Sequence, residues 1–488
     1  MVSYTYCNYY GSDYNGPLKI LIVSSFRMAS SRAGITAEGA LYESVARGNK
    51  DTFFFQEDPE KTLNPFENRY EKTPPLIHEL RRIPPLNGAE FGRSCEFEFE
   101  IAGDIFMQPT ILIDLPTWIP PMEAEAGDAR LIRDAAGNSY GYTNGIAYFL
   151  FSRIQIYQDK LLLEEYSGDA LFARRAGRGS LSSAYLENTL TGWHDGSVTS
   201  IAANATPPRL RLEIPFIGGR QGFPSIAMRK QTFKLRLDLR KLEEIVESSD
   251  ATTTEPARPW LLPIMQNGAT SIKPLALTAI AAPTLQLESR HIYTDGETQV
   301  ALRSKTIELP FSRIYENTYN FGVTDYAPLL KNVPAIVTRR LDAQHPASRV
   351  FWFIRSRQDL RAGRRWKFTG TGAQEYYANE SLIIAGRDRE TLFSPFIWNT
   401  LTHHAKEDRD CGAGIGEMSW DLGDVYGRRA PFHDKQPEGS VNFTTADRPT
   451  LYTSLADAAG SNTEMTAIVD TWVLYVIENN RGYLKYGN

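Results

Sequence analysis

The sequence is poor in the residues that most often supply reactive groups or covalent cross-links. Its 488 residues include 3 cysteines and 7 histidines, and Cys7, Cys95 and Cys411 lie far apart. Cysteines this widely spaced do not form a disulfide framework, so we expect folding in a reducing compartment. Cys95 falls on the apolar side of an alternating stretch, which predicts a small core residue.

Long hydrophobic runs and an excess of one charge are also missing. No run approaches the roughly 18 apolar residues of a membrane-spanning helix, and the short apolar stretch 19–23 fits a strand better than a secretory signal. The 53 Lys and Arg residues nearly balance 58 Asp and Glu residues, so the net charge is −5. We therefore expect a soluble protein whose main task is not nucleic-acid binding.

Zinc-hydrolase and phosphate-loop patterns are missing too. No histidine begins an H-E-x-x-H or H-x-x-E-H motif. The most metal-like cluster is His403, His404 and Cys411, but adjacent histidines point apart, so a solvated polar loop explains it better. The glycines at 412, 414 and 416 lack the Walker lysine and predict a flexible loop. We predict no enzymatic activity, no catalytic residue, no metal site and no cofactor.

A basic stretch, RAGRRWK at residues 361–367, surrounds Trp366. A tryptophan among cations can stack on nucleic-acid bases. The cluster is small and the chain is slightly acidic, so an exposed loop or a subunit contact is the favoured explanation.

The chain is rich in strand-like alternation. In residues 95–101 the side chains of Cys95, Phe97, Phe99 and Ile101 share one face, and Glu96, Glu98 and Glu100 share the other. This period of two is typical of a strand with one buried face. Further strands are predicted at residues 52–55, 110–115, 146–157, 161–166, 210–216, 233–239, 285–293, 350–354, 382–385, 396–398, 441–443 and 471–477. Short helices are predicted at 77–82 and within 167–188.

Many short strands, long loops and few helices predict an all-β protein made of sandwiches. A single core stops growing near roughly 250–300 residues, so the length predicts two large domains. We place an N-terminal arm at 1–50, a first sandwich at 51–294, a linker at 295–310 and a second sandwich at 311–488. Exposed or inter-subunit loops are predicted at 120–143, 248–259 and 403–439.

Five segments, in this order, resemble the double jelly-roll major capsid proteins of nucleocytoplasmic large DNA viruses. They are the strand and Gly-Asp turn at 97–106 (FEFEIAGDIF), the hairpin at 145–166 followed by Gly168 and Asp169, the strand–turn–strand at 211–237, the segment PEGSVNF at 437–443 and the last strand at 472–486. The family continues PEGSVNF with Ser-Arg-x-Asp, of which only Asp447 is kept here.

The resemblance implies two tandem eight-stranded jelly-roll β-sandwiches, a double jelly roll with long inter-strand loops and a few short helices. It implies a structural major capsid protein of the virion, whose homotrimers form pseudo-hexameric capsomers that tile an icosahedral shell. The implied partners are copies of the chain, neighbouring capsomers, minor capsid or penton proteins and, indirectly, an internal membrane, with no specific nucleic acid. The implied location is the capsid shell, after synthesis in the host cytoplasm.

Two alternatives stay open. One is a minor or paralogous capsid protein, or an assembly scaffold, with the same fold. The other, more remote, is a jelly-roll carbohydrate-binding or hydrolytic protein, but hydrolysis needs paired carboxylates in a cleft, and the glutamates at 96, 98 and 100 lie on a wet strand face. Three sequons, at Asn204, Asn379 and Asn442, could carry glycans if the chain meets a glycosylating enzyme; chance occurrence explains them more simply.

Overall fold

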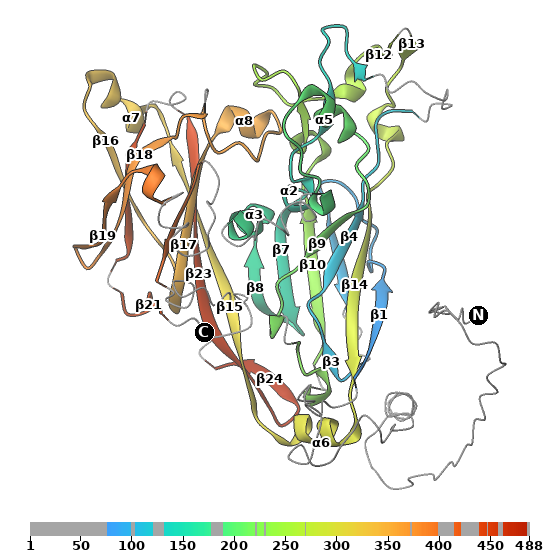
Figure 1. The fold of residues 1–488 in the computed structure, drawn as a ribbon, viewed down its shortest axis with the longest axis vertical. Helices are drawn as coiled ribbons and strands as arrows, with labels where there is room; N and C mark the ends of the chain where they lie inside the picture. The colour runs from blue at the N-terminus through green and yellow to red at the C-terminus, as the bar shows by residue number, and fades with distance from the viewer. Residues whose placement is uncertain are drawn as a thin grey trace, which may run out of the picture.

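The computed structural model describes residues 76–98, 103–120, 131–176, 189–219, 222–228, 231–268, 270–370, 373–398, 414–420, 439–446, 448–456 and 462–485. Most of the regular structure in these ranges is β-strand, and the strands form two sandwiches that stand side by side (Figure 1). No helix among these residues is long and apolar enough to cross a membrane.

The first sandwich consists of two facing sheets built from residues 77–293. One sheet has the strand order β1 (Ile77–Ile83), β14 (Thr284–Tyr293), β4 (Thr110–Asp114) and β9 (Leu210–Glu213), with β3 (Ile105–Phe106) also paired to β14. The other sheet has the order β2 (Ser94–Glu98), β10 (Phe233–Leu239), β7 (Phe151–Gln158) and β8 (Leu161–Tyr166).

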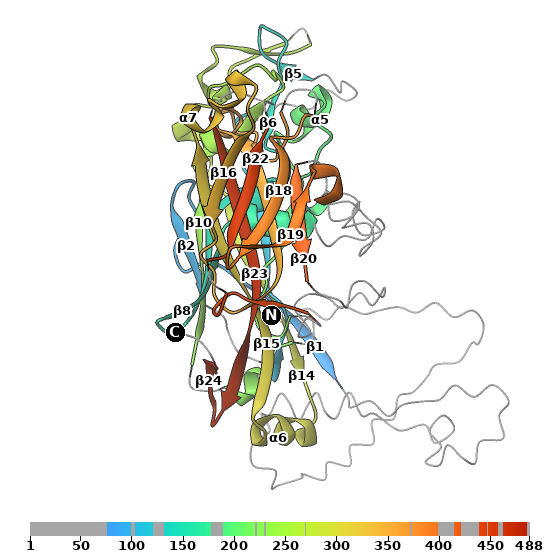
Figure 2. The same ribbon diagram turned by 90° about the vertical axis from the view of Figure 1, so that its left-hand side faces the viewer.

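The second sandwich has the same plan. Its inner sheet has the order β15 (Ile307–Phe321), β23 (Thr463–Glu478), β17 (Pro346–Ser356) and β20 (Ile415–Ser419), with β21 (Val441–Asn442) on β17 and β24 (Arg481–Leu484) on β23. Its outer sheet has the order β16 (Ala335–Arg340), β22 (Thr450–Leu455), β18 (Tyr377–Ile384) and β19 (Arg387–Phe393). Figure 2, seen from this side, shows the outer sheet in front. Each sandwich therefore has eight principal strands, which confirms the predicted fold class.

Small elements cap the sandwiches. Above the first lie two minor sheets, β6 (Tyr140–Tyr142) with β11 (Val246–Ser248), and β5 (Ile132–Arg133) with β12 (Met265–Asn267) and β13 (Thr270–Ile272). The helices are short: α2 (Ile146–Phe149), α3 (Gly168–Ala176), α5 (Val198–Ala203), α6 (Gly296–Ser304), α7 (Val323–Tyr326) and α8 (Arg357–Arg361). Single 3-10 turns are η3 (Ser225–Ala227), η4 (Leu242–Glu244), η5 (Pro259–Leu261), η6 (Leu277–Ala279) and η7 (Leu329–Lys331).

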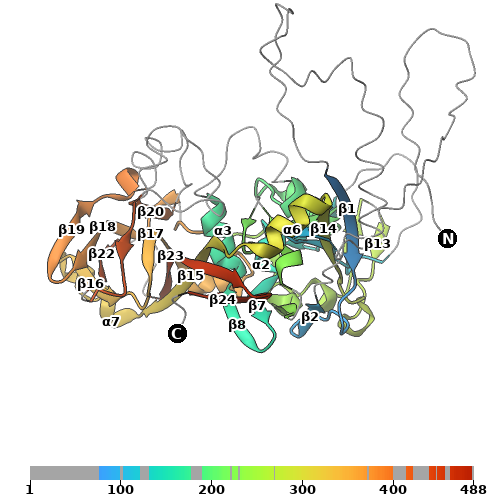
Figure 3. The same cartoon turned by 90° about the horizontal axis from the view of Figure 1, so that it is seen from below.

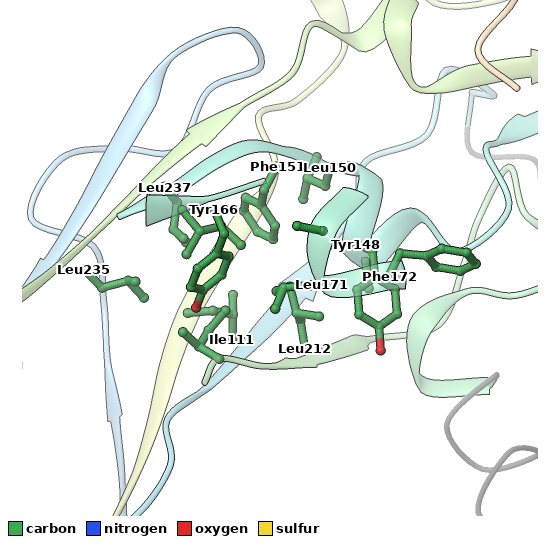
Figure 4. Close-up of a cluster of buried hydrophobic side chains, with 14 of the residues drawn as sticks. Ile111, Tyr148, Leu150, Phe151, Tyr166, Leu171, Phe172, Leu212, Leu235 and Leu237 are labelled. Carbon is green, nitrogen blue, oxygen red and sulfur yellow. The ribbon is translucent and has the colours of Figure 1, made fainter. Parts of the chain in front are cut away.

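The predicted alternation decides which side chains enter the first core. Cys95 and Phe97 of β2 are fully buried and lie opposite Leu237 and Leu235 of β10. Glu96 and Glu98 point away from this core, as expected for the wet face of a strand. Leu235 and Leu237 reach toward Ile111 of the facing sheet (Figure 4). The last part of the predicted strand, residues 99–101, lies outside the described residues.

Four expectations about secondary structure are wrong in part or in full. Residues 77–82, expected as a helix, belong to the strand β1, because residues 77–83 pair along their whole length with β14. Residues 146–149, expected as the start of a strand, form one turn of helix, α2, before β7. Residues 396–398 form a helical turn in which the Trp398 N–H donates to the Ser394 carbonyl. The expected loop 403–439 contains β20, which pairs with β17.

The boundary between the sheets of the two sandwiches falls between β14 and β15. Strands up to β14 pair with one another, and strands from β15 onward pair with one another. The segment predicted as a linker, 295–310, contains α6 and the first residues of β15. Asp295 caps α6 by accepting a hydrogen bond from the Thr298 N–H at 3.0 Å. The predicted domain boundaries, 51–294 and 311–488 with a linker at 295–310, stay a prediction. So do the arm at 1–50 and the strand at 52–55, which lie outside the described residues.

The second sandwich has a core of its own, and its inner sheet also contributes to the core of the first. The buried cluster of the first sandwich continues onto the inner sheet of the second and includes Phe351, Phe353 and Ile468. Neighbouring residues of the same strands, Val350 and Trp352, belong to a second cluster inside the second sandwich. Because successive side chains of a strand point to opposite faces, the inner sheet is buried on both.

Candidate functional site at the seam between the sandwiches

Helix α3 lies between the two sandwiches (Figures 1 and 3). It begins directly after β8, where the Ser167 hydroxyl accepts a hydrogen bond from the Ala170 N–H at 3.1 Å. This is the usual capping contact of a serine that precedes a helix. Leu171 and Phe172 of α3 are buried in the core of the first sandwich. The helix is thereby fixed with its charged residues toward the second sandwich.

The Asp169 carboxylate of α3 forms ion pairs with arginine side chains of both sandwiches. It lies 2.7 Å from Arg240 of the first sandwich and 3.0 Å from Arg355 of β17, and Arg365 approaches to 4.0 Å. Burial alone would raise the pKa of Asp169, but Arg355, Arg240 and Arg365 together hold the pKa well below its usual range. The carboxylate is therefore ionised and joins the two halves of the chain.

One helical turn further along, Arg174 makes a second charged contact. Its Nε lies 3.0 Å from Oδ2 of Asp470 on β23, and both side chains are almost fully buried. Ser312 of β15 completes the group, because its hydroxyl donates to Asp470 at 2.7 Å and accepts from Arg174 at 2.9 Å. These additional hydrogen bonds offset part of the cost of removing the ion pair from water.

Two glutamates on opposite sides make the third contact. Glu164 of β8 accepts a hydrogen bond from the Ile314 N–H of β15 at 3.2 Å. Glu316 of β15 accepts from the Ser167 hydroxyl at 2.9 Å. Burial raises the pKa of Glu164 to about 8 despite Arg174, and burial also raises the pKa of Glu316. Glu164 is therefore largely protonated at neutral pH.

We call this polar interface the seam. It comprises Glu164, Ser167, Asp169, Arg174 and Arg240 of the first sandwich and Ser312, Ile314, Glu316, Arg355, Arg365 and Asp470 of the second. Two further contacts extend it at its ends.

The basic stretch 361–367 makes the upper contact. Arg364 donates to the carbonyl oxygens of Thr253 and Asp250 at 2.7 and 3.2 Å, and Trp366 donates to Glu247 at 2.8 Å. Arg364 is buried. The expectation of an exposed loop is therefore wrong for Arg364, whose side chain binds the other sandwich of the same chain. The same contact fixes part of the loop predicted as exposed at 248–259.

The C-terminal hairpin makes the lower contact. Gln158 at the end of β7 donates to the Gly482 carbonyl at 2.7 Å and accepts from the Tyr475 hydroxyl at 2.9 Å. The Gly482 N–H donates to Gln231 at 2.7 Å. A side chain at position 482 would clash with the Tyr475 hydroxyl, since a Cβ there would lie 2.0 Å from it. We call these contacts the lower latch.

The seam can hold the two sandwiches at a fixed relative orientation. Hydrogen bonds and ion pairs need defined distances and angles, whereas apolar contacts tolerate sliding. Its charged groups are buried against one another, which does not suit binding a substrate. Among the residues that the structure describes, no group of three or more His, Cys, Asp or Glu could hold a metal ion.

The predicted glycosylation sites lie in different surroundings. Asn204 is 8% exposed, and its amide donates to the Tyr142 carbonyl at 2.7 Å, so a glycan there would have to displace this bond. Asn379 is half-buried in β18, and Asn442 in β21 is exposed. Glycosylation at these positions stays a prediction.

The glycine-rich and serine motifs have structural explanations. Gly416, expected in a flexible loop, lies in β20, where a Cβ would come within 2.3 Å of the Trp352 ring. Residues 137–141 spell G-x-S-x-G, but they do not form a nucleophile elbow. Its Ser139 is fully buried and precedes strand β6, whereas a nucleophile elbow leads into a helix. The cluster His403, His404 and Cys411 lies outside the described residues.

The seam residues themselves were not anticipated. The signal was present, because Arg355 directly follows the apolar run 350–354 and Asp470 interrupts the apolar run 467–477. A charge inside such a run is either paired or destabilising. Which partners the charges meet depends on strands and a helix more than 100 residues away.

A scan against protein-family models finds no match, and neither does a search of curated proteins. Among solved structures, the chain resembles the PBCV-1 virus capsid at 14% identity with a TM-score of 0.64, over 87% of this chain and 100% of that one. It resembles the Faustovirus major capsid protein at 12% identity with a TM-score of 0.59, over 86% of this chain and 93% of that one. These likenesses establish the double jelly-roll fold that the sequence resemblance implied.

Proposed function

We propose that this chain is a structural capsid protein that assembles as a homotrimer and tiles an icosahedral viral shell. The observation that carries the proposal is the full-length match: the likeness to the PBCV-1 capsid covers all of that chain, so both sandwiches and their arrangement are shared. The seam supports it further. A chain with two sandwiches at a fixed orientation contributes two of the six corners of a pseudo-hexagonal block, and three chains complete the block.

The proposal includes partners, location and the lack of catalysis. The partners are copies of this chain, neighbouring capsomers and minor capsid or penton proteins, with indirect contact to an internal membrane. The location is the capsid shell, after synthesis in the host cytoplasm. The charged groups described here serve packing between sandwiches, so we propose that the protein is not an enzyme.

Light scattering after size-exclusion chromatography tests the assembly state. We expect three times the mass of one chain, and negative-stain images of hexagon-outlined particles with threefold symmetry. A stable monomer at micromolar concentration would contradict the proposal. Obligate subunit contacts of this kind bury on the order of 2,000–5,000 Å² and do not dissociate at that concentration.

A minor or paralogous capsid protein with the same fold is the second candidate. The observation that favours it is the reduced motif after residues 437–443, where only Asp447 of the family's Ser-Arg-x-Asp is kept. Copy number per virion, measured by quantitative mass spectrometry, separates the two. A carbohydrate-binding role is a more remote alternative, and a glycan array would test it.

A further inference from the structure

His345 has an unusual backbone conformation directly before β17. Its φ angle is +71°, in the left-handed region that residues other than glycine rarely adopt. Such a conformation persists only where surrounding contacts hold it in place. The contacts here come from residues 439–446, which contain β21 and the turn after it, and which we call the late segment. Figure 1 shows β21 at the lower end of the second sandwich.

The main chain of His345 binds the late segment in both directions. The His345 N–H donates to the Thr444 hydroxyl at 2.7 Å, and the Phe443 N–H donates to the His345 carbonyl at 3.0 Å. Strand pairing continues this contact, with Pro346 opposite Asn442. Phe443 is 3% exposed and belongs to the buried cluster of the second sandwich. A displacement of His345 would therefore loosen the segment that carries Phe443 into this core.

The imidazole of His345 is buried in surroundings that suit only its neutral form. Its Nε2 atom is shielded from water and has no hydrogen-bond partner among the described residues. The ring lies beside Tyr315 of β15, with 6.2 Å between the ring centroids, and the Arg313 guanidinium lies 5.4 Å from the centroid of the same Tyr315 ring. Burial and the positive charge of Arg313 both lower the pKa of His345.

The neighbouring elements supply no compensating negative charge. The late segment contains no Asp, Glu, His, Lys or Arg, and residues 346–348 at the start of β17 are uncharged. On β15 the groups near the imidazole are Arg313 and Tyr315. The nearest acidic residue in the sequence, Asp342, is exposed and lies 3.6 Å from Arg340, and Asp470 of the neighbouring β23 is already paired at the seam. Among the described residues, no carboxylate offsets the Arg313 charge at the imidazole.

We propose that His345 is an acid-sensitive switch, whose protonation moves the imidazole into water and releases the late segment from the second sandwich. Once the ring has left the core, water solvates the imidazolium away from Arg313, so the open form binds a proton more tightly than the closed form. By linkage, the open form becomes more favourable as the pH falls through the range in which a free histidine titrates. The switch lies within one chain and does not depend on the proposed function.

Amide hydrogen exchange of the full chain, measured by mass spectrometry, tests the switch. Rates at pH 7.5, 6 and 5 are expressed as protection factors, which remove the intrinsic pH dependence of exchange. We expect the protection of a peptide containing Phe443 to fall by about 5-fold or more between pH 7.5 and 5, because its amide bond to His345 opens. Protection in β22, on the other sheet of this sandwich, should change little.

Three variants assign the response to this histidine. Asparagine tolerates the left-handed conformation and does not titrate, so His345→Asn should keep the late segment closed and protected equally at all three pH values. Arg313→Gln keeps the histidine but removes the neighbouring charge, so its acid response should be smaller than that of the wild type. His78→Asn is the matched control, because His78 is exposed on β1 of the other sandwich, and it should respond as the wild type.

Constant protection of the wild-type late segment from pH 7.5 to 5 would overturn the proposal, as would an equal acid response in the wild type and in His345→Asn. If His345→Asn opens the late segment already at pH 7.5, Arg313→Gln decides. A reduced acid response in that variant then supports the switch, and a response as large as in the wild type overturns it.

Discussion

The two faces of the inner sheet of the second sandwich are both buried, but by different chemistry. Val350, Trp352 and Ile354 enter a cluster made of apolar side chains within their own sandwich. Phe351, Phe353 and Arg355, which alternate with them along β17, face the first sandwich. The first face meets a mostly apolar layer, in which the buried Glu380 accepts a hydrogen bond from Thr453 at 2.9 Å. The second meets apolar residues interrupted by several ion pairs and hydrogen bonds that join the two sandwiches.

The two faces therefore have different roles: one stabilises the second sandwich, and the other fixes its orientation relative to the first. Burying apolar area stabilises the sandwich, and it does so without strong preference for one sliding position. A buried ion pair adds little net stability, but it is costly to misalign, because an unpaired charge in the interior is strongly unfavourable. The seam therefore selects one orientation between the sandwiches.

The largest loss of stability should follow a cavity in the apolar face. We expect Trp352→Ala to lower the free energy of unfolding by about 3–5 kcal/mol, because a fully buried indole is removed beside Trp398 and Gly416. Urea unfolding followed by circular dichroism measures this. The control is Ile336→Ala, an exposed residue of the same sandwich. A loss below about 1 kcal/mol for Trp352→Ala would mean that this face is not the main source of stability.

A smaller but qualitatively different loss should follow a change in the seam. We expect Asp169→Asn to cost about 3 kcal/mol, because Arg240, Arg355 and Arg365 lose their shared carboxylate. Since the contact joins the two sandwiches, unfolding should also split into two transitions. Differential scanning calorimetry checks both effects. Asp238→Asn, which removes a more exposed partner of Arg236, is the control and should change little.

The seam should also make stability depend on pH. The folded pKa of Glu164 is raised to about 8, above its ordinary value of 4.5, so the folded state keeps a proton that the unfolded state releases. Stability from this group is fully present below about pH 4.5 and is progressively lost as the pH rises toward 8. Glu164→Gln keeps an acceptor for Ile314 and should flatten this decline.

Unfolding free energies at pH 5, 6.5 and 8 measure the difference. Burial raises the pKa of Glu316 as well, so some decline should remain in the variant. Equal pH dependence in the wild type and in Glu164→Gln would show that Glu164 is not protonated in the folded protein. The lowered pKa of Asp169 acts in the other direction, with stability lost below about pH 4.

The smallest effect should come from the lower latch. We expect Gln158→Leu to cost about 1–2 kcal/mol, because the Gly482 carbonyl loses its donor and the Tyr475 hydroxyl its acceptor. Amide hydrogen exchange in β24 should become faster while exchange in β17 stays unchanged. Gln155→Leu is the control, since its amide binds Glu165 within one sheet of the first sandwich. Equal effects of the two variants would argue against a latch.

Much of the fold could be predicted from the chain, because strand alternation is a local property. The buried positions of Cys95 and Phe97, and the two-sided burial of β17, follow from residue order alone. The prediction was wrong where local signals were ambiguous. Residues 77–83 carry three charges between two prolines and form a strand only because β14 offers a pairing edge.

The candidate site could be predicted to a smaller extent. Arg364 and Trp366 were recognised as unusual, but the sequence suggested an exposed loop or a partner subunit. Their acceptors, near residues 247–253, are more than 100 positions away in the chain. The same holds for Asp169, whose partner Arg355 is 186 residues further along.

The sequence by itself determined that this protein is all-β, which positions face a core, and that two sandwiches follow one another. Period-two patterning and chain length are enough for that, since apolar and polar residues alternate within each strand and thereby identify its buried and its solvent-facing side. Only the tertiary structure decided that the sandwiches share a polar seam. Contacts between distant segments depend on how strands are ordered in sheets, and the local alternation of residues is the same for many such orders.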